Sequence, residues 1–108
     1  MTSLKIYPFI LETVRLTKPF QERIASRNWD LGDQLHRSMT SVPLNTAEGA
    51  YRNDGNQRER FKTAMGSANE SASTLQTSEV LGYVGDVTAL VDRWDRIART
   101  LNKLARAS

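Results

Sequence analysis

Apolar residues recur at steps of three and four along nearly the whole chain, a spacing that places them on one face of an α-helix. The clearest stretch is the last one, from Val87 to Ala105. On a helical wheel its apolar positions fill an arc of roughly 140°, opposite the basic residues. Asp86, after Gly85, is a suitable cap for its start. The stretch predicts a strongly amphipathic helix, with Val87, Leu90, Val91, Trp94, Ile97, Ala98, Leu101, Leu104 and Ala105 on its apolar face.

Three earlier stretches repeat this spacing, and each is followed by residues typical of a turn. Helices are expected over residues 4–24, 30–51 and 57–81, with turns at 26–30, 52–55 and 82–86. The third stretch is rich in Ser, Thr and Ala, so a neighbouring helix is able to approach closely, and Gly66 is interpreted as such a contact. The pattern predicts an all-α fold, an antiparallel up-down-up-down four-helix bundle that forms a single domain over residues 1–108.

The second stretch contains residues that helices rarely tolerate, in the segment SVPLNTAEGAYR. Pro43 has no backbone N–H, which predicts a kink near Ser38–Pro43 in an otherwise continuous helix. Ser41, Asn45 and Glu48 share one helical face. Because this face lies close to the expected core, the carboxylate of Glu48 needs partners.

The partners available to this polar stripe are Arg37, one turn before Ser41, together with Asn69, Glu70 and the hydroxyls of the third helix. We interpret the stripe as a structural polar network that fixes the kink and the register of the second and third helices. A ligand or catalytic site is the alternative. The residues assigned to the network are Arg37, Ser41, Asn45, Glu48 and Glu70.

The composition argues against catalytic chemistry. The chain has no Cys and a single His, which excludes disulfides, thiol nucleophiles and the usual zinc sites. A di-iron site in a four-helix bundle uses two Glu-x-x-His motifs, whereas the nearest version here, Asp33-x-x-His36, occurs once. We therefore expect no enzyme, metal or cofactor. No stretch approaches the roughly 20 apolar residues that span a bilayer, and no leader precedes the first helix, so a cytoplasmic location is expected.

Positive charge is concentrated at the two ends of the chain. The net charge is +3; residues 1–28 carry five Lys and Arg against two Glu, and residues 83–108 carry five against three acidic residues. The last helix presents Arg93, Arg96, Arg99, Lys103 and Arg106 opposite its apolar face. These side chains are candidate phosphate contacts, although Asp92 and Asp95 dilute the charge and a merely solvated surface is the alternative. Trp94 lies on the apolar arc, so we expect it in the core and not as a platform for bases.

The segments LGDQLHRSMTSVPLNTAEGAYR, RFKTAMGSANES and LGYV resemble the four-helix-bundle proteins of intervening sequences in bacterial 23S ribosomal RNA genes. The accessory variability determinant of diversity-generating retroelements is related to this family. His36 departs from the family pattern, which usually has a basic residue there, and Thr46, Lys62 and Ser71 stand where it prefers apolar side chains. The matching positions are Leu31, Gln34, Leu35, Arg37, Ser41, Pro43, Asn45, Ala47, Glu48, Gly49, Arg52, Phe61, Ala64, Gly66, Ser67, Glu70 and Leu81 to Tyr83.

The resemblance implies a homo-oligomer, specifically a pentameric ring. For members linked to retroelements it also implies a basic surface that binds nucleic acid and a reverse transcriptase as partner. We therefore expect a non-enzymatic oligomeric module that contacts RNA or DNA through the basic face of the last helix, with help from the first. The alternative is a protein-only scaffold or adaptor with no nucleic-acid role.

Overall fold

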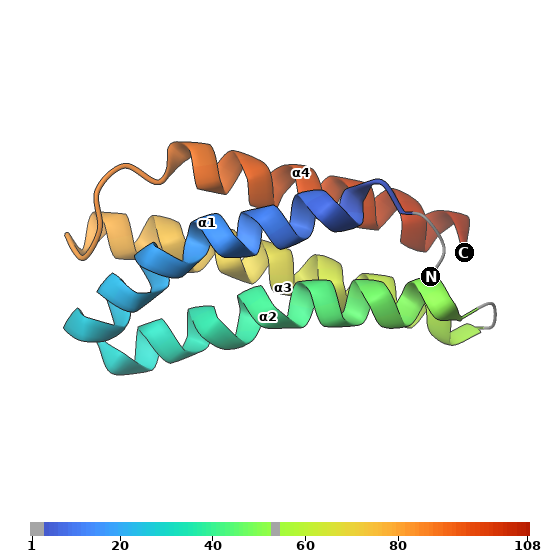
Figure 1. Cartoon of the computed structure of the whole chain (residues 1–108), viewed down its shortest axis with the longest axis horizontal. Helices are drawn as coiled ribbons and strands as arrows, with labels where there is room; N and C mark the ends of the chain where they lie inside the picture. The colour runs from blue at the N-terminus through green and yellow to red at the C-terminus, as the bar shows by residue number, and fades with distance from the viewer. Residues whose placement is uncertain (1–3, 53–54) are drawn as a thin grey trace.

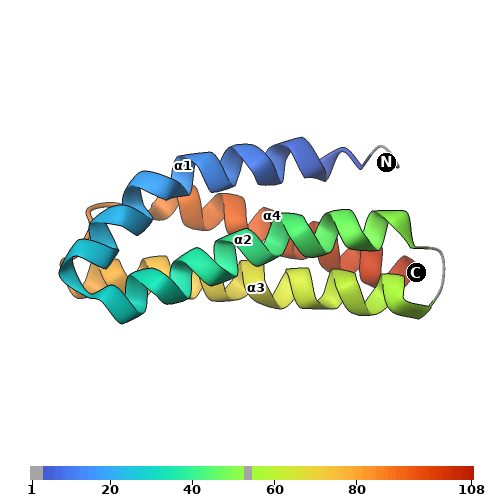
Figure 2. The same ribbon diagram turned by 60° about the horizontal axis from the view of Figure 1, so that its bottom comes forward.

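Four α-helices lie side by side along one long axis in the computed structural model, which describes residues 4–52 and 55–108 (Figure 1). They are α1 (Ile6–Arg27), α2 (Trp29–Tyr51), α3 (Gly55–Val80) and α4 (Thr88–Ala107). Each helix packs against the next and α4 returns to α1, while α1 and α3 lie diagonally opposite (Figure 2). The all-α, antiparallel up-down-up-down bundle predicted from the hydrophobic spacing is confirmed.

The turn between α1 and α2 consists of a single residue, Asn28, in an extended conformation. Its backbone N–H donates to the carbonyl of Ile24 (2.7 Å), and its side-chain Oδ1 accepts from the N–H of Leu31 (3.0 Å). One asparagine therefore ends the first helix and caps the second. Such a tight connection forces α1 and α2 into antiparallel contact.

Pro43 lies inside α2, which continues without a break from Trp29 to Tyr51. Proline removes one donor from the helical ladder, and here Pro43 is itself buried among the helices. The continuous helix expected through this residue is confirmed, and a kink at this point stays a prediction. Because α2 is unbroken, side chains before and after Pro43 keep helical register along one rod.

The turn between α3 and α4 begins at Leu81, and the next residue, Gly82, has a left-handed φ of 77°. The N–H of Tyr83 donates to the carbonyl of Ser78 (2.9 Å), and that of Gly82 to Glu79 (3.0 Å), a Schellman arrangement. Leu81, expected on the apolar face of the third helix, lies in this turn and is 51% exposed. The helix ends one residue earlier than the spacing suggests.

Asp86 begins the approach to α4. Its Oδ1 accepts hydrogen bonds from the backbone N–H and the hydroxyl of Thr88 (2.9 and 2.7 Å), the first residue of the helix. These bonds favour the charged carboxylate, so they lower the pKa of Asp86 below its ordinary value, the hydroxyl of Thr88 being the larger cause. The N-cap of α4 is Val87, whose side chain makes no capping bond, so Asp86 lies one residue before the predicted cap and satisfies the N–H of the first helical residue from there.

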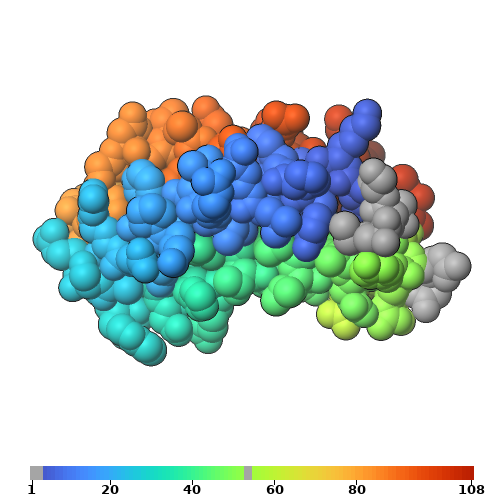
Figure 3. Space-filling view, in the orientation of Figure 1, coloured from blue at the N-terminus to red at the C-terminus, as the bar shows by residue number. Residues whose placement is uncertain are grey.

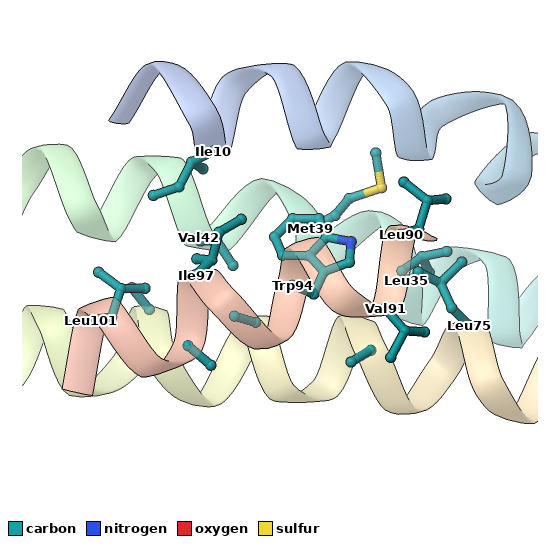
Figure 4. Packing of buried hydrophobic residues seen from close by; sticks show 14 of the residues in the cluster. Ile10, Leu35, Met39, Val42, Leu75, Leu90, Val91, Trp94, Ile97 and Leu101 are labelled. Carbon is teal, nitrogen blue, oxygen red and sulfur yellow. The ribbon is translucent and has the colours of Figure 1, made fainter. Parts of the chain in front are cut away.

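The core is built mainly from Leu, Ile, Val and Ala, with Trp94 fully buried at its centre (Figure 4). The indole N–H of Trp94 donates to the hydroxyl of Thr17 on α1 (3.2 Å). Trp94 is therefore a core residue, as predicted, and it ties the apolar face of α4 to α1.

Several hydroxyl side chains are also buried, including Thr46 and Ser71, which stand at positions expected to be apolar. Thr46 donates to the carbonyl of Val42 (2.7 Å), and Ser71 to that of Ser67 (3.0 Å), each one turn earlier. No buried side-chain nitrogen or oxygen in the described residues lacks a hydrogen-bond partner. The Ser- and Thr-rich α3 is therefore able to face the core without leaving polar atoms unsatisfied.

The glycines that permit close helix contact are Gly32 and Gly49. A Cβ added to Gly32 would overlap Ala25 on α1, coming 2.6 Å from its backbone nitrogen, and one on Gly49 would lie 2.7 Å from the ring of Phe61. Gly66 is exposed, and a Cβ there would meet no atom within 4 Å. The predicted helix contact at Gly66 is therefore wrong, because that residue lies on the outer side of α3.

Candidate functional site

Four of the five cations predicted on the last helix lie on the open outer face of α4. Arg96, Arg99, Lys103 and Arg106 are all exposed. None of the four forms an ion pair with another described residue. Arg96 and Arg106 are ten residues apart, which places them about 15 Å apart along the helix axis. These four side chains, which we name the α4 basic face, are free to contact an external anion.

Arg93, the fifth predicted cation, has a different environment. Its side chain is only 22% exposed and its Nη2 lies 2.7 Å from Oε1 of Glu12 on α1. Its Nε donates to the hydroxyl of Thr13 (2.9 Å), and its guanidinium lies 4.0 Å from the centre of the Phe9 ring. Arg93 therefore joins α4 to α1 and is not on the α4 basic face.

Phe9 also contacts Arg96, whose guanidinium lies 4.5 Å from the centre of the ring. A cation over an aromatic face is attracted by the ring quadrupole, so Phe9 restricts where Arg96 points. Sequence reasoning missed Phe9, Glu12 and Thr13. The sequence does contain a signal: Phe9 and Glu12 are three residues apart on α1, and Arg93 and Arg96 are three apart on α4. That these two pairs meet becomes evident only when the relative position of the two helices is known.

Charge is distributed unevenly among the four helices. α1 carries four Lys and Arg against two Glu, and α4 five against two Asp, whereas α2 carries one Arg against three acidic residues and α3 three against three. α1 and α4 are neighbours in the bundle, and their surfaces adjoin along the face in Figure 3. The bundle therefore has one basic side, formed by α1 and α4, and a more acidic side along α2.

Two aromatic side chains near the basic side, Phe9 and Tyr83, lie against guanidinium groups. Phe9 is covered by two guanidinium groups, and Tyr83 lies 5.5 Å from the guanidinium carbon of Arg27. The aromatic side chains that are largely exposed, Trp29 and Tyr51, are at the two ends of α2. Guanidinium and ammonium groups are the cationic chemistry of the basic side, which also exposes Leu11, Leu16 and Glu12 on α1.

The polar stripe of α2 is only partly the predicted network. Ser41 and Asn45 contact each other (3.0 Å), Ser67 donates to Ser41 (2.9 Å), and Arg60 donates to Asn45 (3.1 Å). These bonds connect α2 to α3 and fix their relative register. Of the assigned residues, Ser41 and Asn45 therefore join the two helices, through Ser67, one of the third-helix hydroxyls expected as partners, and through Arg60, which the sequence did not reveal.

The three charged residues assigned to this network lie outside it. Arg37 is 73% exposed and pairs with Asp33 (3.3 Å), and Glu48 is 44% exposed and pairs with Arg52 (2.9 Å). Glu70 is exposed. Glu48 is half-buried, but its partner is Arg52 and none of the candidates named from the sequence, Arg37 being three helical turns away.

A shallow groove of about 430 Å³ runs between α2 and α3 next to these bonds. It is lined by Gln34, Arg37, Ser38, Ser41, Ser67 and Glu70. Its buried floor includes a hydrogen bond between Ser38 and Ser71 (2.8 Å), in which either hydroxyl is able to donate. The hydroxyls are already paired within the protein, so the groove is best described as the outer edge of the α2–α3 contact.

The comparison with protein families decides the relationship of the chain. The family described as 23S rRNA-intervening sequence protein matches residues 4–103. The chain belongs to this family. No curated protein and no solved structure shows a significant match.

The match to the 23S rRNA-intervening sequence protein family includes the three N-terminal helices in full and most of α4. Arg96, Arg99 and Lys103 lie within it and Arg106 lies beyond it. In the described part of this family member, no three His, Cys, Asp or Glu side chains gather in an arrangement suited to a metal ion. None of its described helices combines the length and hydrophobicity needed to cross a membrane.

Proposed function

We propose that this member of the 23S rRNA-intervening sequence protein family is a non-enzymatic binding module that contacts RNA or DNA through the α4 basic face. The observation that carries the proposal is the set of four exposed cations without internal ion pairs, Arg96, Arg99, Lys103 and Arg106. Because they lie on the basic side, away from the acidic residues of α2, the positive electrostatic potential around them is stronger.

Phosphate contacts of this kind release condensed counterions, so the affinity falls steeply with salt. Four such contacts on a duplex correspond to a slope of about −3.6 in a plot of log K against log salt concentration. A solvated surface without a nucleic-acid role would give no such binding.

The test is a fluorescence-anisotropy titration of labelled nucleic acid with a pair of matched variants. Arg96→Glu with Lys103→Glu reverses two cations of the α4 basic face. Arg37→Glu with Arg58→Glu makes the same change in net charge with exposed cations of α2 and α3. We expect the first variant to lose binding at low salt and the second to retain it, both with native helix content. Absence of binding by the wild-type protein at low salt would refute the proposal and favour a protein-only scaffold.

We further propose that the module assembles as a homo-oligomer through the outer face of α2, the pentamer implied by the resemblance being the expected size. Leu44 is 70% exposed and Tyr51 is 67% exposed. They are seven residues apart, two turns, and so lie on one flank of α2. Large apolar side chains left in water on one flank favour a second copy of the chain over solvent as their neighbour.

Analytical ultracentrifugation of Leu44→Gln with Tyr51→Gln tests this assembly without changing the charge. Val80→Gln with Leu81→Gln is the control, because it removes exposed apolar side chains at the end of α3. We expect the α2 variant to sediment as a smaller species than the wild type and the control to match the wild type. A wild-type protein that is monomeric at micromolar concentrations would exclude the oligomer.

A further inference from the structure

The basic side of the bundle has two rows of cations, not one. Lys5, the N-cap of α1, precedes Glu12 by seven residues and Arg23 follows it by eleven, both close to whole numbers of turns. Glu12 contacts Arg93 of α4, so Lys5 and Arg23 lie on the flank of α1 that faces α4. Both are exposed and neither forms an ion pair with a described residue. They form a second row, beside the α4 basic face.

The distances within and between the two rows of cations follow from the geometry of the helices that carry them. Lys5 and Arg23 are about 27 Å apart along the helix axis, less than the roughly 34 Å of one turn of a nucleic-acid duplex, so both are able to contact the same turn. α1 and α4 are in contact over a shorter stretch than the other neighbouring helices and cross at an angle (Figure 1), so the two rows are closest where Phe9 meets Arg96. The grooves of B-form DNA that separate its two phosphate rows are about 6 and 12 Å wide. Two rows of cations on adjacent helices offer separate contacts for the two phosphate strands on either side of a groove.

The surface is poorly suited to a single strand. Proteins that bind single strands order them by stacking bases on aromatic side chains. Here Phe9 is already covered by Arg93 and Arg96, and Tyr83 by Arg27. A single strand would also offer one flexible row of phosphates to two rows of cations.

We infer that the ligand of the basic side is double-stranded nucleic acid, held by its phosphates across α1 and α4 without reading of the bases. This inference rests on the proposed nucleic-acid function and names its substrate class. Arg96, restrained by Phe9, meets the duplex in a preset position, and Lys5 and Arg23 contact the second strand. Because phosphates carry the binding, the base sequence has little influence on affinity.

The experiment compares three probes of one sequence and about 20 base pairs, two helical turns: duplex DNA, duplex RNA and the single strand. We expect a duplex to bind about tenfold or more tightly than the single strand at the same salt concentration. The difference in affinity between duplex DNA and duplex RNA then shows which of the two is the preferred ligand. A·T-rich and G·C-rich duplexes should differ by no more than about twofold.

The variant Lys5→Glu with Arg23→Glu tests the α1 row, with Arg37→Glu and Arg58→Glu as the control of equal net charge. Glutamate at position 5 is compatible with the helix dipole, and Arg23 is exposed, so the small dipole cost of Glu at position 23 is expected to leave the fold intact. We expect duplex affinity to fall about fivefold or more relative to the control. Equal or tighter binding of the single strand, or no difference between the two variants, would overturn the inference and leave the α4 basic face in place. Failure of every probe to bind would overturn the proposed function itself.

Discussion

Gly32 and Gly66 are both helical glycines, but they have opposite surroundings. A methyl group at Gly32 would overlap Ala25, including its backbone, whereas one at Gly66 would meet no atom within 4 Å. Gly32→Ala is therefore expected to lower the free energy of unfolding by about 1–3 kcal/mol through overpacking. Gly66→Ala should raise it by about 0.5–1 kcal/mol, because alanine is the better helix former. Urea denaturation followed by circular dichroism measures both.

Equal effects of the two substitutions would contradict this assignment of contacts. Gly32 and Gly66 also show a limit of prediction from the sequence. Glycine in a helical pattern indicates either a close contact or a tolerated weakness, and the pattern does not distinguish them. Only the position of α1 relative to α2 shows that Gly32 is the residue without room.

Asp86 gives the start of α4 a dependence on pH. Hydrogen bonds from Thr88 lower its pKa in the folded protein. Stability from the charged carboxylate is therefore complete above the pKa of the unfolded chain and is lost as the pH falls through the lower folded pKa. We expect Asp86→Ala to lower Tm at neutral pH, with the difference from the wild type shrinking in acid. A difference in Tm that stays constant on acidification would show that the carboxylate charge is not involved.

At the scale of helices, two neighbouring arginines on α4 have separate roles. Arg93 bonds Glu12 and Thr13 on α1, while Arg96 touches Phe9 and faces solvent. Arg93→Ala should lower the free energy of unfolding by about 1–2 kcal/mol because it removes these bonds between helices. Arg96→Ala should change it by less than about 0.5 kcal/mol and instead weaken nucleic-acid binding. Thermal unfolding and anisotropy titration of both variants check the division, and a larger stability loss in Arg96→Ala would contradict it.

The helices themselves were predictable, because each has a continuous apolar face at three- and four-residue spacing. The polar stripe of α2 was predictable only in part. Asn45 and Ser41 follow from i, i+4 geometry, whereas Arg60 and Ser67 are brought to them by the register of α3. Glu48 is half-buried and pairs with Arg52 on its own helix, because a few tens of degrees on the helical wheel separate an inward from an outward side chain and the position of the neighbouring helix decides between them.

At the scale of the whole molecule, the two proposed surfaces are on different helices. The basic side is formed by α1 and α4, and the exposed apolar flank belongs to α2. A copy bound through α2 would therefore leave the basic side of each protomer accessible. An assembly of several copies would present repeated basic sides, which sums their fields and permits simultaneous contacts with one long duplex.

This arrangement predicts that assembly changes the affinity for long duplexes and not for short ones. Leu44→Gln with Tyr51→Gln, which leaves the charge unchanged, should bind a duplex of about one helical turn within about twofold of the wild type. The same variant should lose about tenfold or more in affinity for a duplex of about four turns, because simultaneous contact through several protomers is lost. Val80→Gln with Leu81→Gln is expected to match the wild type on both lengths. Anisotropy titrations with both duplexes measure the effect, and an equal loss on the short duplex would mean that Leu44 and Tyr51 belong to the binding surface and not to an interface between copies.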